Sequence, residues 1–275
     1  MNNIPEFPNQ TEITSEHFEV IKKALVDQDI RSADYSAYYL TGWFYHRPAR
    51  ISRIGERLVF DVEGKQGGHI FLGPLGTGPI KPAVEKLLYH AEKDFGEERV
   101  LRFLPHRLAE AISAEITPVR SEEHRDYFDY LYLREELADL TGGKFAKRRN
   151  QLNKFQRENN AEVVILKEED NEQILRCLDR WYENYGDEDP FLEMERESVR
   201  RMLPNLWKLG GIGVRVQVQE HMCGISWAVP ITDETWLVPV EKAPRDVKGM
   251  YQYVNWALAN SLPAHVKILN READM

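Results

Sequence analysis

The chain has 275 residues, of which 42% are apolar, and carries a formal net charge of −9 at pH 7. This length and apolar content suffice for one large or two ordinary domains with buried cores. A net negative charge disfavours general binding to nucleic acids, so we expect no DNA partner. The sequence has no run of about eighteen apolar residues and begins without the basic and apolar regions of a signal peptide. We therefore expect a cytoplasmic protein without a transmembrane segment.

The two cysteines, Cys177 and Cys223, lie far apart in the sequence and outside any CxxC or Cys/His cluster. In a cytoplasmic protein this pattern predicts buried, reduced thiols and no structural metal. The histidines are scattered, and the sequence alone assembles no Ser/His/Asp triad.

The first half of the chain predicts helices alternating with short strands. Apolar spacing of three to four residues indicates helices, whereas alternation with a period of two indicates strands. The expected helices cover residues 15–27, 35–44, 82–91 and 107–112, and the expected strands include 58–62, 69–72, 100–104 and 127–133.

The second half shows the same two patterns. The expected helices cover residues 144–158, 171–185, 191–209 and 248–262, and the expected strands cover 161–166, 214–219, 223–230, 235–240 and 266–269. Three short strands, a loop, a long helix and a further strand thus occur twice, in residues 50–105 and 211–270. This repeat predicts a mixed α/β fold in two similar domains, and the Gly142-Gly143 pair suggests domains of residues 1–140 and 141–275.

The strongest electrostatic signal lies in residues 144–157, which carry a charge of +6 while the rest of the chain carries −15. At ~100° per residue, four of these cations fall on one helical face, and they are Lys144, Lys147, Arg148 and Lys154. Such a face suits a polyanion such as RNA. The alternative is a solvated surface helix whose cations pair with neighbouring carboxylates.

A second candidate is the loop that contains Gly73, Gly76 and Gly78, between a predicted strand and a predicted helix. Backbone N–H groups at the start of a helix can bind an anion. The spacing matches neither a P-loop nor a dinucleotide fingerprint, so an ordinary tight turn is the alternative interpretation.

The third group of candidates lies near the end of the chain. Tyr251 and Asn255 share one face of the last helix, and Asn270 and Arg271 follow the last predicted strand, where α/β sites commonly lie. A polar rim over a core, or a simple ion pair, explains the same residues without chemistry.

The sequence resembles a bacterial family that shares the C-terminal domain of the phosphatidylglycerol lysyltransferases. The most specific stretch is residues 130–155, YLYLREELADLTGGKFAKRRNQLNKF. Weaker matches are residues 32–36, 73–76, 248–252 and 270–272.

This resemblance implies two acetyltransferase-like (GNAT) domains in tandem and transfer of an acyl or aminoacyl group. It further implies a donor that is aminoacyl-tRNA or acyl-CoA, with tRNA as a partner of the basic helix. The roles implied for Tyr251, Asn255, Asn270 and Arg271 are those of residues lining the transfer cleft; the general base, the acceptor and the oligomeric state are not assigned.

A non-catalytic binding module for a metabolite, a polyanion or a protein is the competing hypothesis. Residues 245–250 lack the second small residue of an acetyl-CoA loop, and the chain stops soon after its last predicted strand. Both features favour the module, so the sequence leaves the two functions open.

Overall fold

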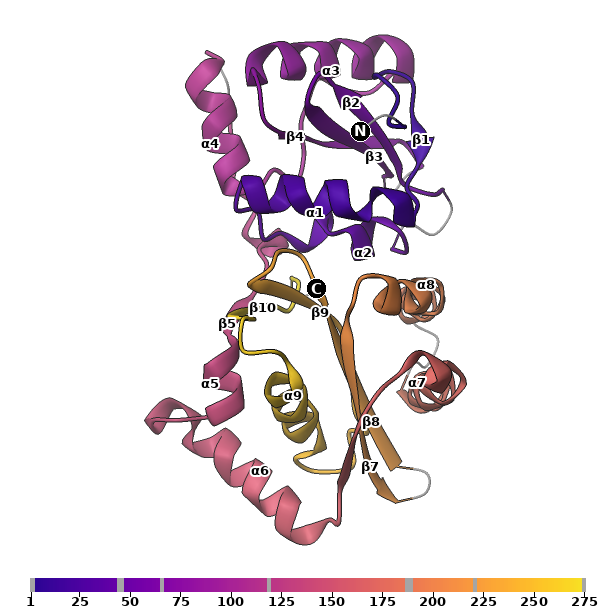
Figure 1. Ribbon diagram of the computed structural model, residues 1–275, viewed down its shortest axis with the longest axis vertical. Coiled ribbons are helices and arrows are strands. Elements are labelled where there is room, and N and C mark those ends of the chain that lie inside the picture. Colours follow the sequence, from indigo (N-terminus) through magenta and orange to yellow (C-terminus); the bar gives the residue numbers. More distant parts are fainter. Residues whose placement is uncertain are drawn as a thin grey trace. The chain divides into compact units, whose positions relative to one another are not determined.

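The computed structural model describes residues 3–43, 47–64, 67–117, 120–185, 190–219 and 222–273. The chain forms two compact units, Met1–Phe128 with Ala273–Met275, and Asp129–Glu272. One sheet has four strands and the other has six, so the fold is mixed α/β with two sheets (Figure 1).

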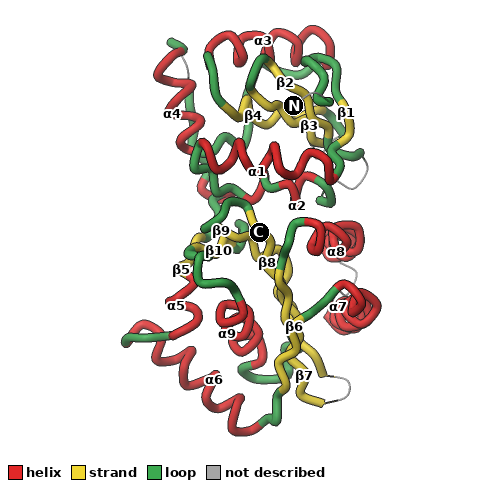
Figure 2. Tube along the Cα trace, viewed as in Figure 1, coloured by secondary structure: helices red, strands yellow, loops and turns green. Residues whose placement is uncertain are grey.

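The first unit is an antiparallel sheet with a helix on each face. Figures 1 and 2 show α1 and α3 on opposite faces of the sheet, whose strand order is β1-β2-β3-β4. Its elements are β1 (Thr11–Glu12), α1 (Phe18–Asp27), α2 (Ala37–Leu40), β2 (Arg50–Ile54), β3 (Arg57–Glu63), β4 (His69–Gly76), α3 (Ile80–Phe95) and α4 (His106–Glu115).

Helix α3 shows why the first unit folds in this way. Its apolar residues recur at helical spacing, and Ala83, Leu87 and Ala91 are buried against the sheet. Phe7 and Phe71 complete this core, with their ring centroids 5.5 Å apart in an edge-to-face arrangement.

The second unit is a larger mixed sheet with helices on both faces. Figure 1 shows α5, α6 and α9 on one face and α7 and α8 on the other. Its elements are β5 (Leu131–Leu133), α5 (Arg134–Asp139), α6 (Ala146–Glu158), β6 (Glu162–Ile165), α7 (Asn171–Tyr185), α8 (Pro190–Lys208), β7 (Ile212–Gln219), β8 (Met222–Pro230), β9 (Thr235–Lys242), α9 (Met250–Ser261) and β10 (Ile268–Asn270).

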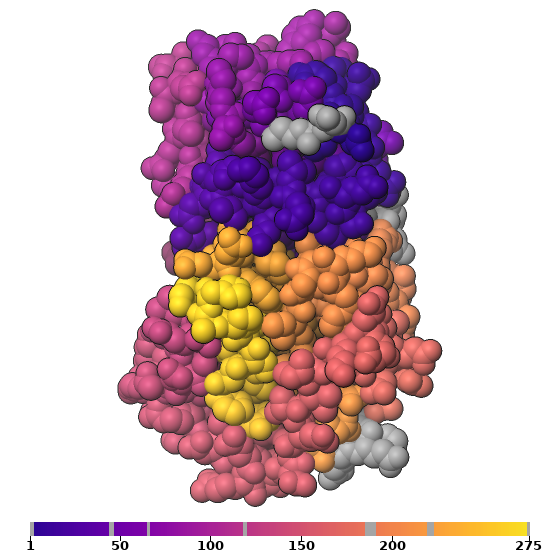
Figure 3. Space-filling view, in the orientation of Figure 1, coloured from indigo at the N-terminus to yellow at the C-terminus, as the bar shows by residue number. Residues whose placement is uncertain are grey.

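The strand order of this sheet is β5-β10-β9-β8-β7-β6. Strand β10 pairs in parallel with β9 and antiparallel with β5, so it lies between segments distant in the sequence. Helix α9 packs over the sheet, and its Met250, Val254 and Leu258 join Val214 and Val216 of β7 in one core. In the space-filling view, the yellow C-terminal part of this unit reaches the surface beside the pink α5–α6 segment (Figure 3).

The two units share one order of elements. In each, a strand and two helices precede three antiparallel strands and a long helix, and the four strands are neighbours in sequence order, β1-β2-β3-β4 and β6 to β9. The repeat differs at its end, because β10 follows α9 whereas residues 100–104 form no strand after α3. The predicted strand at 100–104 is therefore wrong; Val100 is 49% exposed and does not pack as a sheet residue.

Several predicted boundaries also moved. The sequence placed the domain break after residue 140, whereas β5 and α5 belong to the second unit because β5 pairs with β10. The predicted strand 127–133 shortens to β5, and the predicted helix 35–44 becomes α2 preceded by a 3₁₀ turn, because buried Tyr35 and Tyr38 serve as core anchors. Phe44 lies outside the described residues.

The cysteines correct a further prediction. Cys177 of α7 and Cys223 of β8 form a disulfide rather than two free thiols. Helix α7 packs against the start of β8 and brings the two Cα atoms to 6.4 Å, within the range that a disulfide spans. Their separation in sequence concealed this proximity.

Candidate functional site

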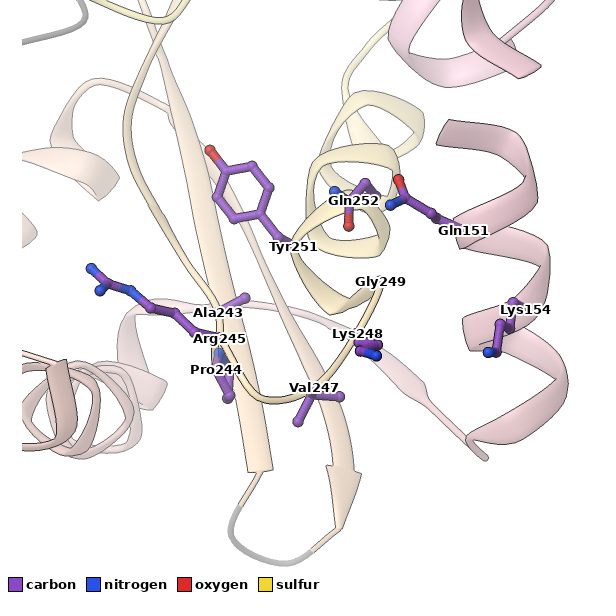
Figure 4. Close-up of a pocket in the computed structure, with 10 residues that line it drawn as sticks. All are labelled: Gln151, Lys154, Ala243, Pro244, Arg245, Val247, Lys248, Gly249, Tyr251 and Gln252. Atoms are coloured by element: carbon purple, nitrogen blue, oxygen red, sulfur yellow. The ribbon is translucent and has the colours of Figure 1, made fainter. Parts of the chain in front are cut away.

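A pocket of about 500 Å³ opens in the second unit between α6 and the start of α9 (Figure 4). Two residues of α6 form one side, and the β9–α9 connection, residues 243–249, forms the other together with the first turn of α9. The lining residues are Gln151, Lys154, Ala243, Pro244, Arg245, Val247, Lys248, Gly249, Tyr251 and Gln252.

Gly249 allows the two helices to approach at the base of this pocket. Its φ of 89° is left-handed, and a Cβ atom there would lie 3.0 Å from the carbonyl oxygen of Gln151 and 3.0 Å from Cβ of Phe155. Only glycine accepts both the backbone conformation and the contact. Phe155 is fully buried below, with its ring centroid 4.9 Å from that of Tyr253.

The pocket is cationic and holds no carboxylate. Lys154, Arg245 and Lys248 are among its ten lining residues, which include neither Asp nor Glu. Figure 4 shows the amide of Gln151 directed from α6 toward the first turn of α9, where Gln252 lies. Cations together with neutral amide donors suit an anionic ligand that also offers hydrogen-bond acceptors.

Beside the pocket, Glu241 near the end of β9 gathers three of the four predicted catalytic residues. Its side chain is only 5% exposed. Nη2 of Arg271 donates to Oε1 of Glu241 at 2.9 Å and to the Tyr251 hydroxyl at 2.7 Å, and Nδ2 of Asn255 donates to Oε2 of Glu241 at 2.9 Å. One carboxylate thus orients an amide, a guanidinium and, through Arg271, a phenol.

This arrangement shifts two pKa values upward. Desolvation, followed by the charge of Glu241, raises the pKa of Tyr251 to about 12, although the residue as a whole is 44% exposed. Desolvation alone would lower the pKa of Arg271, but Glu241 and then Tyr251 outweigh it, and the pKa rises. Tyr251 is therefore a neutral phenol at physiological pH, and Arg271 is a fixed cation.

The fourth predicted catalytic residue, Asn270, lies elsewhere. It is fully buried in β10, where its amide donates to Oδ2 of Asp129 at 2.7 Å and its carbonyl accepts from the backbone of Glu272 at 2.8 Å. These contacts connect β10 to the segment before β5, which is a structural arrangement.

The four predicted polyanion-binding residues divide into three groups. Lys154 lines the pocket, and Lys144 pairs with Glu136 at 2.6 Å. Lys147 and Arg148 are exposed and have no ion pair within the described part of the chain. Lys154 also faces Glu158 at 3.7 Å, an exposed pair that solvent screens.

The predicted anion loop of the first unit uses its amides internally. The N–H of Gly73 donates to the Tyr35 hydroxyl at 3.0 Å, and that of Gly76 donates to Gln28 at 2.7 Å. Arg57 donates to the carbonyl of Gly78, which follows β4. These contacts are those of a tight connection and give the anion-binding hypothesis no support.

A family profile described as "Phosphatidylglycerol lysyltransferase, C-terminal" matches residues 29–273. The chain belongs to this family. A search of curated proteins found no match.

Solved structures agree with this lysyltransferase C-terminal family. A conserved protein of unknown function from Bacteroides thetaiotaomicron is 28% identical, with a TM-score of 0.85 over 96% of this chain and 90% of that one. L-PGS from Bacillus licheniformis is 13% identical, with a TM-score of 0.56 over 98% of this chain and 79% of that one. FemX is 10% identical, with a TM-score of 0.52 over 97% and 89%. At these last two identities the likeness concerns the fold alone.

Sequence reasoning missed several residues of the site in this family member. Glu241 was missed because its partner Arg271 lies thirty positions away, and the hydrogen bond between them depends on the parallel pairing of β9 and β10. Arg245 and Gln252 lie within residues 245–250 and 248–252, which were noted in the sequence without a role for either residue. Their position in the pocket beside α6 was the missing information. Among the described residues, no three His, Cys, Asp or Glu side chains form a metal-binding group, and no helix there is long and apolar enough to cross a bilayer.

Proposed function

We propose that this chain is an aminoacyltransferase of two GNAT-like domains in tandem, with aminoacyl-tRNA as the donor. Family membership and the shared order of elements in the two units support the proposal. The observation that carries it is a carboxylate-free, cationic pocket that lies beside the Glu241 cluster and extends to the basic face of α6.

In this mechanism the terminal phosphates of the donor contact Lys154 and Lys248, and Lys147 and Arg148 hold the RNA backbone nearby. An amine or hydroxyl of the acceptor attacks the ester carbonyl, and a tetrahedral oxyanion forms before the ribose oxygen leaves. The cation of Arg271 stabilises developing negative charge, and the neutral Tyr251 hydroxyl is placed to donate to the leaving oxygen. The acceptor's proton passes to a base that we do not assign.

The β9–α9 connection favours tRNA over acyl-CoA as the donor. An acyl-CoA diphosphate is bound by backbone N–H groups of a glycine-rich turn. Residues 243–249 contain one glycine, which is used for the contact with α6. A ligand here therefore meets charged side chains more than backbone amides.

The test is retention of aminoacyl-tRNA on a filter at low salt. Replacing Lys147 and Arg148 together by Ala removes two exposed cations, so we expect strong loss of retention. The slope of log affinity against log salt should also fall by about 1.5, since each phosphate contact contributes roughly 0.7–0.9.

The matched control replaces Arg99 and Arg102 by Ala, which removes the same charge from exposed positions of the first unit. Equal retention by the Lys147/Arg148 variant and the wild type would remove the RNA role. Transfer of a radiolabelled amino acid to candidate lipid, peptide and protein amines then tests catalysis separately.

A further inference from the structure

The wall of the pocket is held in place from the opposite face of the sheet. Residues 243–248, here called the pocket loop, follow β9, whose last two side chains point to opposite faces. Glu241 faces α9 and binds Asn255, whereas Lys242 faces α7 and α8, where its Nζ contacts both carboxylate oxygens of Glu195 at 2.9 and 2.8 Å.

Trp181 of α7 makes the central contact with this loop. Its indole Nε1 donates to the carbonyl oxygen of Ala243 at 3.0 Å. The same ring lies 4.3 Å from Nζ of Lys242 and 5.7 Å from the guanidinium carbon of Arg245, both within reach of cation–π attraction. One side chain therefore contacts the last residue of β9 and two residues of the pocket loop.

The disulfide lies one helical turn before Trp181. Cys177 and Trp181 are four residues apart on α7 and share one face, and Cys177 is bonded to Cys223 at the start of β8. The next residue, Gly224, packs so closely on the loop that a Cβ there would lie 3.3 Å from Cβ of Ala243. The disulfide thus holds α7 against the start of β8. It thereby keeps Trp181 beside the pocket loop.

We propose that Cys177–Cys223 and Trp181 form a redox-sensitive clamp on the pocket loop. When the disulfide is closed, α7 presents Trp181 to Ala243 and the pocket keeps its shape. When it is reduced, α7 is released at this point, the Trp181 contacts weaken, and the pocket binds its ligand less tightly. The identity of that ligand rests on the proposed function; the clamp itself does not.

Closure requires an oxidant, for which a low-molecular-weight disulfide such as oxidised glutathione is sufficient. The thiolate of Cys223, the more exposed cysteine, attacks one sulfur of the reagent and releases one small thiolate. The thiolate of Cys177 then attacks Cys223 in the mixed disulfide and releases the second. Two protein thiols are oxidised and one small disulfide is reduced to two thiols, which take up the two protons.

Amide hydrogen exchange of the pocket loop tests the clamp without any ligand. Reduction of the wild type, or replacement of both cysteines by Ser, should accelerate exchange in residues 243–249 by about 10-fold, a coupling of common size. Trp181→Phe keeps an aromatic ring, although a smaller one, and removes the N–H donor, so it should accelerate exchange in the same segment of the oxidised protein. Because both changes act through one contact, reduction should add little in the Trp181→Phe variant.

Peptides from β2 and β3 of the first unit are the internal control. Unchanged exchange in the pocket loop after reduction would overturn the proposal. Equal acceleration throughout the second unit would also overturn it, because the disulfide would then stabilise the whole unit rather than the loop.

Binding of aminoacyl-tRNA to oxidised and reduced protein separates the clamp from the proposed function. We expect the affinity for aminoacyl-tRNA to fall by about 10-fold on reduction. If reduction accelerates exchange in the pocket loop but the protein binds no RNA in either state, the clamp is supported and aminoacyl-tRNA is rejected as the donor. RNA bound equally in both states would retain the donor and reject the clamp.

Discussion

At the scale of single residues, Glu241 determines how the site is built. It is a buried carboxylate whose two oxygens are engaged by a guanidinium and an amide. A buried charge of this kind persists only because it is paired and hydrogen-bonded. Burying the Glu241 carboxylate therefore costs desolvation free energy that apolar residues would not cost. This cost is expected if Glu241 serves to position Arg271 and Asn255.

Replacing Glu241 by Ala leaves Arg271 without its partner in a mostly buried position, where its side chain is 19% exposed. We expect a loss of about 3 kcal/mol in unfolding free energy, measured by urea denaturation. Glu241→Gln, which keeps the shape and one acceptor, should lose less. The control Asp27→Ala breaks the exposed pair with Lys23 and should cost about 0.5 kcal/mol; similar losses in both variants would contradict this account.

The shifted pKa of Tyr251 predicts a pH dependence of stability. Because the folded-state pKa of about 12 exceeds the free value of about 10, the folded chain binds more protons between these limits. The contribution of Tyr251 to stability is complete below about pH 10 and is lost as pH rises toward 12.

Tyr251→Phe should therefore make unfolding free energy fall less steeply over this interval, as measured by urea denaturation at several pH values. Tyr130→Phe, at an exposed position of the same unit, serves as the control. Identical slopes in the wild type and in Tyr251→Phe would show that the hydroxyl is not desolvated.

At the scale of elements, the pocket depends on how closely α6 and α9 approach each other. Gly249→Ala should cost about 1–2 kcal/mol for the left-handed backbone alone, and the added methyl group also meets Gln151 and Phe155. We expect reduced stability together with weaker binding in the pocket. Gly55→Ala tests the backbone effect by itself, since Gly55 is also left-handed but has open space around it. Equal effects of the two changes on binding would argue against close helix contact as the basis of the pocket.

Elements with local signals were predictable from the sequence, and those defined by distant partners were not. Helix α7 begins and ends where its apolar spacing indicated. Gly142-Gly143 does not divide the two units, because β5 and α5 before it belong to the second unit. The predicted strand at 100–104 is a short, mostly apolar segment, but it forms no ladder with another strand among the described residues. Strand identity depends on pairing, which local alternation does not encode.

The same reasoning applies to the site. Tyr251 and Asn255 were predictable because they share a helical face, and Arg271 because it follows a strand. Glu241 and the Cys177–Cys223 bond required tertiary contacts between separate elements. Asn270 had the right sequence signal, yet pairing of β10 with β5 turned its side chain toward Asp129.

At the scale of the whole molecule, the distinction between a transferase and a binding module is thermodynamic. A donor present at 100 times its dissociation constant should add about 2.7 kcal/mol to the folding stability. We expect this stabilisation in a thermal-shift measurement with aminoacyl-tRNA, and not with acyl-CoA esters. Deacylated tRNA is the matched control for the aminoacyl group. A shift with acyl-CoA alone would reverse the assignment of the donor, and no shift with any of them would favour the module.

The position of β10 between β5 and β9 has a consequence for how the second unit folds. Strands β5 and β9 are separated by about a hundred residues. Both pair with residues 268–270, so neither can complete its hydrogen bonds before these residues are present. During synthesis the unit therefore cannot close its sheet until almost all of it has left the ribosome. Until then β5 and β9 each present an unpaired edge, and chaperones or neighbouring nascent chains have their best opportunity to bind there.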